Sequence, residues 1–210
     1  SNAGDTIAAI IASQSGDRIT DFDGGAVEGI AIRGINSGNG TWQYSLDGST
    51  WSNVGTVNTG SALLLRATDY LRYVPDALNA ATPSVTFVAW DQTSGTAGIK
   101  VDSTSTGGST AFSDAVGIAQ VNVSGVNDAP TIADGFVVNL TGTNEDTPSL
   151  ATSVDAVVTS ASWGDVDTGA VKGIAVTGVV GNGNWQYSTD GSTWTNFGAV
   201  SGSNALLLSA

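Results

Sequence analysis

Oxygen-bearing side chains stand close together in two short segments of the sequence. Asn127 and Asp128 are adjacent, and Asp165 and Asp167 form an Asp-x-Asp unit later in the chain. Alternate residues of an extended segment point to the same side, so Asp165 and Asp167 can chelate one ion together. Ca²⁺ collects roughly six to eight oxygens from carboxylates, amides, backbone carbonyls and water. The four residues are therefore predicted to form a Ca²⁺ site, in which the cation would offset the repulsion between the acids.

The same residue types also have a purely structural interpretation. Asp and Asn are common turn formers because their side chains accept hydrogen bonds from nearby backbone groups. Either pair taken alone favours a turn, whereas the four residues together, with a connector stiffened by Pro130, favour calcium. Asp47 and Asp190 each precede a glycine within a hairpin signal, so they are predicted to be turn residues only.

The composition excludes several classes of function. The 210 residues include 19 acids and 6 bases, for a net charge of −13, which argues against nucleic acid as a partner. There is no Cys, His or Met, which removes thiol nucleophiles, disulfides, the usual zinc sites and histidine general bases. We expect no enzymatic activity. A glycosidase built on an Asp pair is the remaining enzymatic alternative, and no acidic pair has a recognisable active-site context.

Composition also bears on location. No apolar run approaches the roughly 18 residues that a membrane span requires, so no membrane partner is expected. Charged residues make up only 12% of the chain, which is rich in Gly, Ser and Thr, and this favours an extracellular location. Ser1, Asn2 and Ala3 are typical of the remnant of a cleaved expression tag, so residues 1–3 are excluded from the fold reasoning.

One long phrase of the sequence occurs twice. GNGTWQYSLDGSTW occupies residues 38–51, and GNGNWQYSTDGSTW occupies residues 181–194. The phrase DFDGGAVEGIAIRG likewise returns as DVDTGAVKGIAVTG. A fixed long period indicates tandem copies of one domain. The repeat matches Asp21 and Asp23 of the first copy to Asp165 and Asp167 of the second.

Each copy consists of short strand-like segments. GIAIRGI, GTWQYSL and SVTFVAW alternate apolar with polar residues and are bounded by turn formers, and no stretch shows a convincing 3.6-residue period. We predict an all-β protein of antiparallel β-sandwich repeats in tandem. The first repeat spans residues 4–126 and lacks its first strand region, residues 127–130 are a linker, and residues 131–210 are the truncated N-terminal part of a second repeat.

The two copies are cut out of phase. The second ends before the counterparts of LRYVP, SVTFVAW and AQVNVSG, and the first has no counterpart of GFVVNLTG at residues 135–142. An incomplete sandwich exposes sheet edges. We therefore expect the half repeat to be closed by neighbouring protein, either by folding back or by strand exchange or dimerisation with another molecule.

Three aromatic residues lie close together in the first copy of the repeated phrase. Alternation places Trp42 and Tyr44 on one face of a strand, and a two-residue Asp-Gly turn would bring Trp51 across from them. The rings are expected to fill the core, since their burial is the main source of stability for a chain with few large apolar residues. The alternative is a carbohydrate-binding module in which Trp42, Tyr44 and Trp51 stack on sugar rings.

The acidic segments resemble those of a known family. VNDAP followed by DVD is similar to the connector and Asp-x-Asp elements of cadherin domains, whose sandwich repeats are joined by Ca²⁺-rigidified linkers. The phrases NEDT, GAVKGIAVTG, FVAWDQTSGTAG and VNDAP, with the repeated WQYS phrase, are similar to the cadherin-like tandem repeats of very large bacterial surface adhesins of the RTX/VCBS type, which are exported by type I secretion. The resemblance covers essentially the whole chain after residues 1–3.

The resemblance implies a fold, a role and further ligands. It implies an Ig/cadherin-like sandwich that acts as a Ca²⁺-stiffened spacer or adhesion module in cell adhesion or biofilm formation. Neighbouring repeats of the same protein are the expected partners, together with homotypic, host or matrix surfaces. Asp91 would join the linker residues at one junction, which would hold one or two ions, and the remaining acids would face the junctions on either side. The complete predicted ligand set is Asn127, Asp128, Asp165, Asp167, Asp91, Asp21, Asp23, Glu145 and Asp146.

Overall fold

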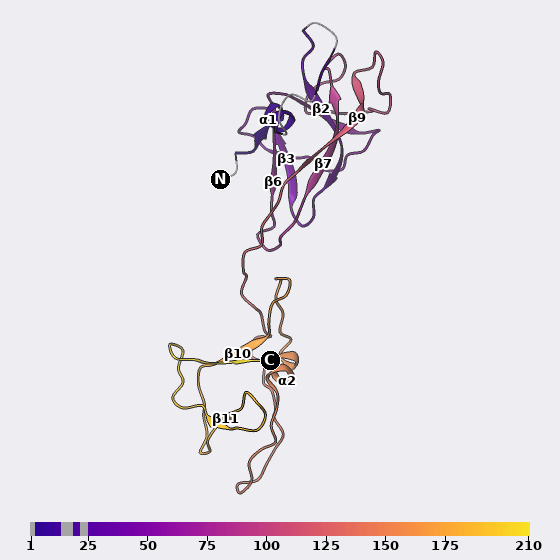
Figure 1. Cartoon of the computed structure of the whole chain (residues 1–210). Helices are drawn as coiled ribbons and strands as arrows, with labels where there is room; N and C mark the ends of the chain where they lie inside the picture. The colour runs from indigo at the N-terminus through magenta and orange to yellow at the C-terminus, as the bar shows by residue number, and fades with distance from the viewer. Residues whose placement is uncertain (1–2, 14–18, 22–24) are drawn as a thin grey trace. The chain divides into compact units, whose positions relative to one another are not determined.

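The computed structural model describes residues 3–13, 19–21 and 25–210. It divides the chain into two compact units, Ser1–Val126 and Asn127–Ala210 (Figure 1). Antiparallel strands dominate the regular structure, which confirms the predicted all-β class. Of the predicted site residues, Asp23 lies outside the described part of the chain.

The first unit contains a four-stranded antiparallel sheet. Its order is β1 (Asp5–Thr6), β6 (Tyr70–Val74), β3 (Thr41–Ser45) and β4 (Ser52–Asn53). Helix α1 (Ile7–Ala12) follows β1 directly. Thr6 caps this helix, because its side-chain oxygen accepts a hydrogen bond from the Ala9 N–H at 3.1 Å.

The second sheet of the first unit is five-stranded and antiparallel. Its order is β8 (Lys100–Val101), β5 (Ala62–Arg66), β2 (Gly29–Asn36), β7 (Ser84–Trp90) and β9 (Phe112–Gln120). The central strand β2 is buried on both faces: Ile30 and Ile32 belong to one apolar cluster and Ala31 to another. Because both faces of this strand are buried, its first four residues, Gly29–Ile32, include no polar side chain.

The main core of the first unit draws on both sheets and on the helix. Ile7 of α1, Ile30 of β2 and Trp42 of β3 are all within it. The Trp42 and Tyr73 rings meet edge to face, with centroids 5.3 Å apart, which is a favourable aromatic geometry. Because β3 and β6 pair side by side, residues some thirty positions apart in the sequence complete one another's packing.

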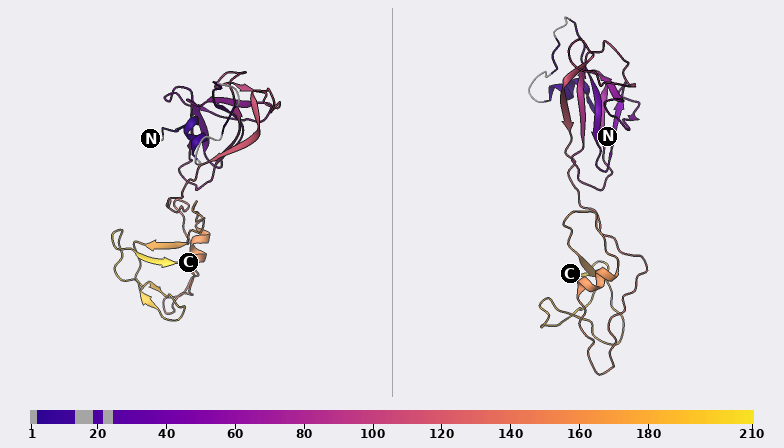
Figure 2. Two further views of the ribbon diagram at one scale, coloured as in Figure 1. Left: turned by 45° about the horizontal axis from the view of Figure 1, so that its top comes forward. Right: turned by 90° about the vertical axis from the view of Figure 1, so that its right-hand side faces the viewer.

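The second unit is much less regular. Strand β10 (Gly173–Val176) pairs with β13 (Leu206–Ser209), and β11 (Gln186–Tyr187) pairs with β12 (Thr195–Asn196). Helix α2 (Val154–Ser160) lies beside the first of these pairs. Figure 2 shows that loops make up most of the unit around these elements.

The two helices correct the expectation that no segment has a helical period. They are only six and seven residues long, so each offers about two turns in which a period could be recognised. Their signals are instead the caps, Thr6 and Ser153, and one apolar face, which buries Ile7 and Ile11 in α1 and Val158 in α2.

The repeated hairpin is also wider than predicted. Gln43 pairs with Asn53 and Tyr44 with Ser52, so residues 46–51 form the loop in place of a two-residue turn. Asp47 organises this loop, since its Oδ1 accepts hydrogen bonds from the Ser49 and Thr50 N–H groups at 2.8 and 2.7 Å. These side-chain hydrogen bonds can order a loop that is longer than a two-residue type I′ or II′ turn.

The same phrase has two different environments in the two units. Trp42 is 3% exposed, whereas its counterpart Trp185 is 46% exposed. Both indole N–H groups still donate to an equivalent backbone oxygen, that of Asn36 in the first unit and that of Val180 in the second. In the second unit, where every residue is described, β11 pairs with β12 alone, so Trp185 lacks the covering strand that β6 provides for Trp42.

This difference predicts unequal effects for two matched substitutions. Trp42→Ala should lower the free energy of unfolding of the first unit by about 3–5 kcal/mol, because it opens a cavity in the core. Trp185→Ala removes a half-exposed ring and should cost roughly 1 kcal/mol or less. Urea unfolding followed by circular dichroism measures both changes. Equal losses for the two variants would contradict the described burial.

Candidate functional site

Three of the predicted calcium ligands, Asp128, Asp165 and Asp167, are linked by hydrogen bonds near the start of the second unit. The Asp128 N–H donates to Asp167 Oδ2 at 2.8 Å, and the Asp167 N–H donates to Asp165 Oδ1 at 2.9 Å. A two-residue bridge holds the segments side by side, because Thr131 and Gly164 exchange both backbone hydrogen bonds. Residues almost forty positions apart are therefore joined directly.

The candidate ligand atoms are oxygens, which suit a hard cation such as Ca²⁺. Three carboxylates and the Asn127 amide are present, and all four supply oxygen, which Ca²⁺ prefers. The Asn127 amide nitrogen donates to the Asp128 carbonyl at 2.9 Å. Over the described residues, Asp167 Oδ1 and Asn127 Oδ1 accept no hydrogen bond, so both oxygens have free lone pairs.

The described residues do not already form a closed metal cage. Among them, no group of three or more acidic side chains is close enough to hold an ion. The bond from Asp167 to the Asp165 carboxylate is also the local turn that the structural interpretation predicts for an Asp-x-Asp pair. The contact from Asp128 to Asp167 goes beyond a local turn, because it joins two separate segments. Calcium binding here stays a prediction.

Asp91 lies at a different end of its sheet from the one predicted. It follows β7, whose last residue Trp90 pairs with Phe112, whereas the chain leaves the sheet at Gln120, opposite Ser84. The length of β7, about 20 Å at 3.3 Å per residue, separates Asp91 from that exit. Asp91 therefore lies at the end of the sheet opposite to the one from which β9 leads into the connector, and its part in a shared calcium site stays a prediction.

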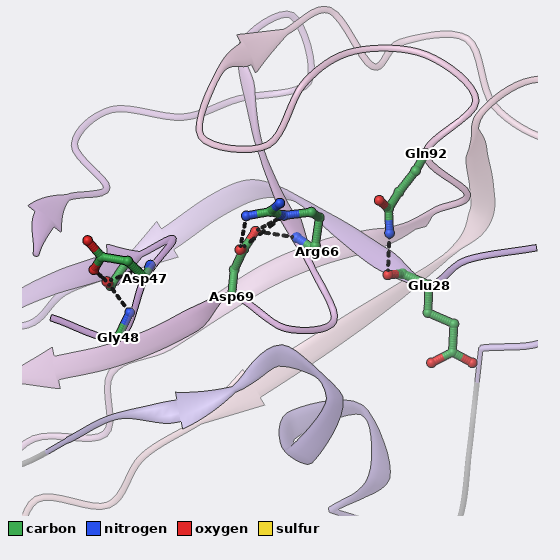
Figure 3. A network of polar contacts seen from close by, with 7 residues as sticks. Glu28, Asp47, Gly48, Arg66, Asp69 and Gln92 are labelled. Atoms are coloured by element: carbon green, nitrogen blue, oxygen red, sulfur yellow. Dashed lines mark hydrogen bonds and ion pairs between the residues drawn. The ribbon is translucent and has the colours of Figure 1, made fainter. Parts of the chain in front are cut away.

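Asp91 instead shares a cavity with Asp21. A cavity of about 610 Å³ is lined by Asp21, Glu28 and Asp91, with the Trp90 and Phe112 rings on its apolar side. The Gln92 amide, next in the chain to Asp91, donates to the Glu28 backbone oxygen at 2.7 Å (Figure 3). Sequence reasoning missed Glu28, because its position depends on the pairing of β2 with β7, which no local pattern reveals.

The other predicted acids lie in turns. Asp146 donates its backbone N–H to the Asn144 side chain at 3.1 Å, and Glu145 is exposed beside it. Asp190 accepts from the Ser192 and Thr193 N–H groups at 2.8 and 2.7 Å, as Asp47 does in the first unit. In both loops these backbone donors hold the pKa of the aspartate well below its usual value. The turn role predicted for Asp47 and Asp190 is confirmed.

One buried acid was not singled out by the sequence. Asp69 is fully buried between β5 and β6, and its carboxylate binds the Arg66 guanidinium at 2.7 Å and the Arg66 backbone N–H at 2.7 Å (Figure 3). The Asp69 carboxylate raises the pKa of Arg66. This pair fixes a tight hairpin and leaves no oxygen in position for a substrate, so its role is structural.

The three aromatic residues of the carbohydrate alternative do not share a face. Trp42 is buried and Tyr44 packs against the same core. Trp51 instead stacks on Arg72, 3.8 Å from the ring centroid. Arg72 also binds Gln43, which lies between Trp42 and Tyr44 on β3 and so points to the opposite side. The expectation that Trp51 lies across from the other two rings is wrong, and a three-ring platform has no geometric basis.

Comparisons with known proteins found no match. No family model matches the sequence, and searches of curated proteins and of solved structures returned none that is similar. Within the described residues, no helix has both the length and the apolar character of a membrane span. Support for a function therefore comes from the chain's own residues.

The loop aspartates predict a specific acid sensitivity. The Asp47 pKa is lowered from its usual 3.8, first by the Thr50 N–H and then by the Ser49 N–H, so its stabilisation is complete above this value and is lost as the pH falls further. Asp47→Asn should therefore lower the Tm at pH 7, and the difference from the parent chain should narrow below about pH 4.

A thermal melt series over pH measures this difference. Asp134→Asn is the control, because Asp134 is exposed and makes no side-chain hydrogen bond within the described chain. A gap between Asp47→Asn and the parent chain that stays constant down to pH 2 would contradict the assigned role.

Proposed function

We propose that the chain is a spacer built from Ig/cadherin-like β-sandwich repeats and stiffened by Ca²⁺ in a large extracellular bacterial adhesin. The observation that carries the proposal is the bond from the Asp128 N–H to Asp167. It ties the residues just after the unit boundary to the Asp-x-Asp segment of the following unit. Two antiparallel sheets that share one core in the first unit support the sandwich.

The chain's own residues fix how the connector enters the second unit. Pro130 restricts the backbone and leaves Ala129 extended. Thr131 is held by its two backbone bonds to Gly164, at 2.7 and 2.9 Å, and Ala133 donates to Ala161 at 3.0 Å. Several successive attachments in so short a segment leave the connector little freedom where it enters the second unit.

Charge supplies the reason for a cation. Asp128, Asp165 and Asp167 lie on bonded segments in a protein with a net charge of −13, and like charges at such separations repel. A bound Ca²⁺ supplies positive charge and shared coordination at this point. The free oxygens of Asn127 and Asp167 are the first candidates to contact it, and further ligands would come from backbone carbonyls and water.

The extracellular, adhesive setting is the broader part of the proposal. A low content of charged side chains and a fold repeated in tandem suit a long surface filament whose modules act as spacers. In that setting the neighbouring repeats are the immediate partners. A stiffened junction holds a distant binding domain away from the cell, in support of cell adhesion or biofilm formation.

A calcium titration tests the proposal. Isothermal calorimetry on the chelator-washed protein should show Ca²⁺ binding, and Asp165→Asn/Asp167→Asn should abolish it while Asp134→Asn leaves it intact. At about 100 times the Kd, Ca²⁺ should stabilise the second unit by about 2.7 kcal/mol. Small-angle scattering should show a narrower range of particle lengths when the ion is present.

Two results would contradict the calcium proposal. The parent chain could release no binding heat and show no change in Tm with millimolar Ca²⁺. Alternatively, the double variant could bind as tightly as the parent. Either result would exclude these carboxylates as the ligands.

A further inference from the structure

The repeated phrase contains the only two Asn-Gly dipeptides of the chain, Asn39–Gly40 and Asn182–Gly183. In this dipeptide the glycine nitrogen can attack the side chain of the asparagine before it, because glycine has no Cβ to hinder the approach. The attack removes the side-chain amide without an enzyme. Since the two dipeptides stand at matched positions of the repeat, the same reactive pair occurs in two different environments.

The reaction needs only water in addition to the chain. At the second dipeptide, the Gly183 nitrogen loses its proton to solvent and forms a bond with Asn182 Cγ, while the bond from Cγ to Nδ2 breaks. The nitrogen that leaves takes up a proton from water and departs as ammonia, and a five-membered succinimide ring remains. Water then opens this ring. Attack at Cγ gives aspartate, and attack at the main-chain carbonyl gives isoaspartate, whose backbone runs through the former side chain.

In the first unit the glycine nitrogen is held in a turn. The Gly40 N–H donates to the Ser37 backbone oxygen at 2.9 Å. Gly40 directly precedes β3, whose first residue Thr41 pairs with Val74 of β6. A nitrogen that donates in this way keeps its proton, and the bond must break before the nitrogen can attack. The turn and the strand together oppose the backbone rotation that ring closure at Asn39 requires.

Strand β6 also crowds Gly40. A Cβ on this glycine would clash with the Tyr73 hydroxyl and with the Val74 backbone oxygen. The Tyr73 hydroxyl donates to the Ser37 backbone oxygen at 2.6 Å, which is the same oxygen that accepts from Gly40. Two hydrogen bonds therefore converge on one carbonyl, and Gly40 has little room in which to move.

The second dipeptide has neither restraint. Over the described residues the Gly183 N–H donates no hydrogen bond, and the Asn182 side chain makes none. A Cβ on Gly183 would meet no atom within 4 Å, and the next strand, β11, begins only at Gln186. Asn182 and Gly183 are both exposed, whereas Gly40 is partly buried. The nitrogen, the amide and water can therefore all meet.

We propose that Asn182 is a site of spontaneous deamidation, through a succinimide formed with Gly183, and that the fold protects its counterpart Asn39. The residue before each asparagine is also a glycine, Gly38 in the first copy and Gly181 in the second. The difference in reactivity therefore comes from the surrounding structure and not from the dipeptide.

The modification would fall in the loop that positions an aromatic ring. The Trp185 indole N–H donates to the Val180 backbone oxygen at 3.1 Å, and Asn182 lies inside the loop that this bond closes. Deamidation adds one negative charge to this loop, and the isoaspartate form also lengthens its backbone by one atom. The protein would thus acquire charge variants at one defined position.

Peptide mapping of the incubated parent chain tests the proposal. The folded protein is kept in mildly alkaline buffer with a chelator, and samples are cleaved after Lys and Arg, which places Asn39 in residues 34–66 and Asn182 in residues 173–210. Tandem mass spectrometry then follows the conversion of each amide to an acid. Asn182 should react at least about fivefold faster than Asn39, because the bond from Gly40 to Ser37 must break first.

Two controls separate the fold from the local sequence. In urea, where both units are unfolded, the two asparagines should deamidate at similar rates. Asn182→Gln keeps an amide at this position but moves it one carbon farther from the backbone, so that the five-membered ring cannot form. This variant should remain unmodified at residue 182 while Asn39 behaves as in the parent chain. Circular dichroism confirms that the variant is folded.

Three results would overturn the proposal. The first is equal rates at Asn39 and Asn182 in the folded chain. The second is an Asn182 that stays intact in the folded chain over the time in which urea-unfolded protein is converted. The third is a difference between the two sites that persists unchanged in urea, which would assign it to the flanking residues. The reaction involves no cation, so its outcome is independent of calcium binding.

Discussion

The packing of this protein depends on strands that come late in a repeat and cover strands that come early. Trp42 is buried because β6 pairs with β3 and places Tyr73 against its ring. Trp185 stands in the same phrase without such a strand and is half exposed. The repeated phrase is buried only where a strand such as β6 pairs beside it. The unequal burial of the two tryptophans follows from this one constraint.

The connector is held to the second unit by hydrogen bonds and not by buried apolar side chains. Asp128, Thr131 and Ala133 attach the connector to the second unit through their backbone N–H groups. Each bond contributes roughly 0.5–1.5 kcal/mol, or up to about 3 kcal/mol for the bond to the Asp167 carboxylate. These hydrogen bonds fix the direction of the connector but contribute little free energy. They also bring the segments that carry Asp128, Asp165 and Asp167 together, and all three side chains are negatively charged. A divalent cation strengthens an arrangement of this type, whereas tight hydrophobic packing would not need one. We therefore propose that the stiffness of this junction depends on calcium.

The all-β class and the sequence repeat could be predicted from the sequence. The alternation of apolar and polar residues is a local pattern, and the repeated phrases recur at a nearly constant spacing. Asp47 and Asp190 could be assigned to turns since their partners lie within three residues. Asp91 and Trp51 could not be placed, because their positions follow from strand pairing and from the face of a strand exposed to Arg72. The helices α1 and α2 could not be predicted, because about two turns are too short to show a 3.6-residue hydrophobic period. Contacts set by register therefore needed the structure.

The most direct measurement is an anomalous difference map from crystals of the chain grown with calcium. The account predicts a Ca²⁺ peak within about 2.3–2.6 Å of carboxylate oxygens from Asp128, Asp165 and Asp167, at the start of the second unit. A map without a peak at this position, with the three carboxylates directed into solvent, would contradict it.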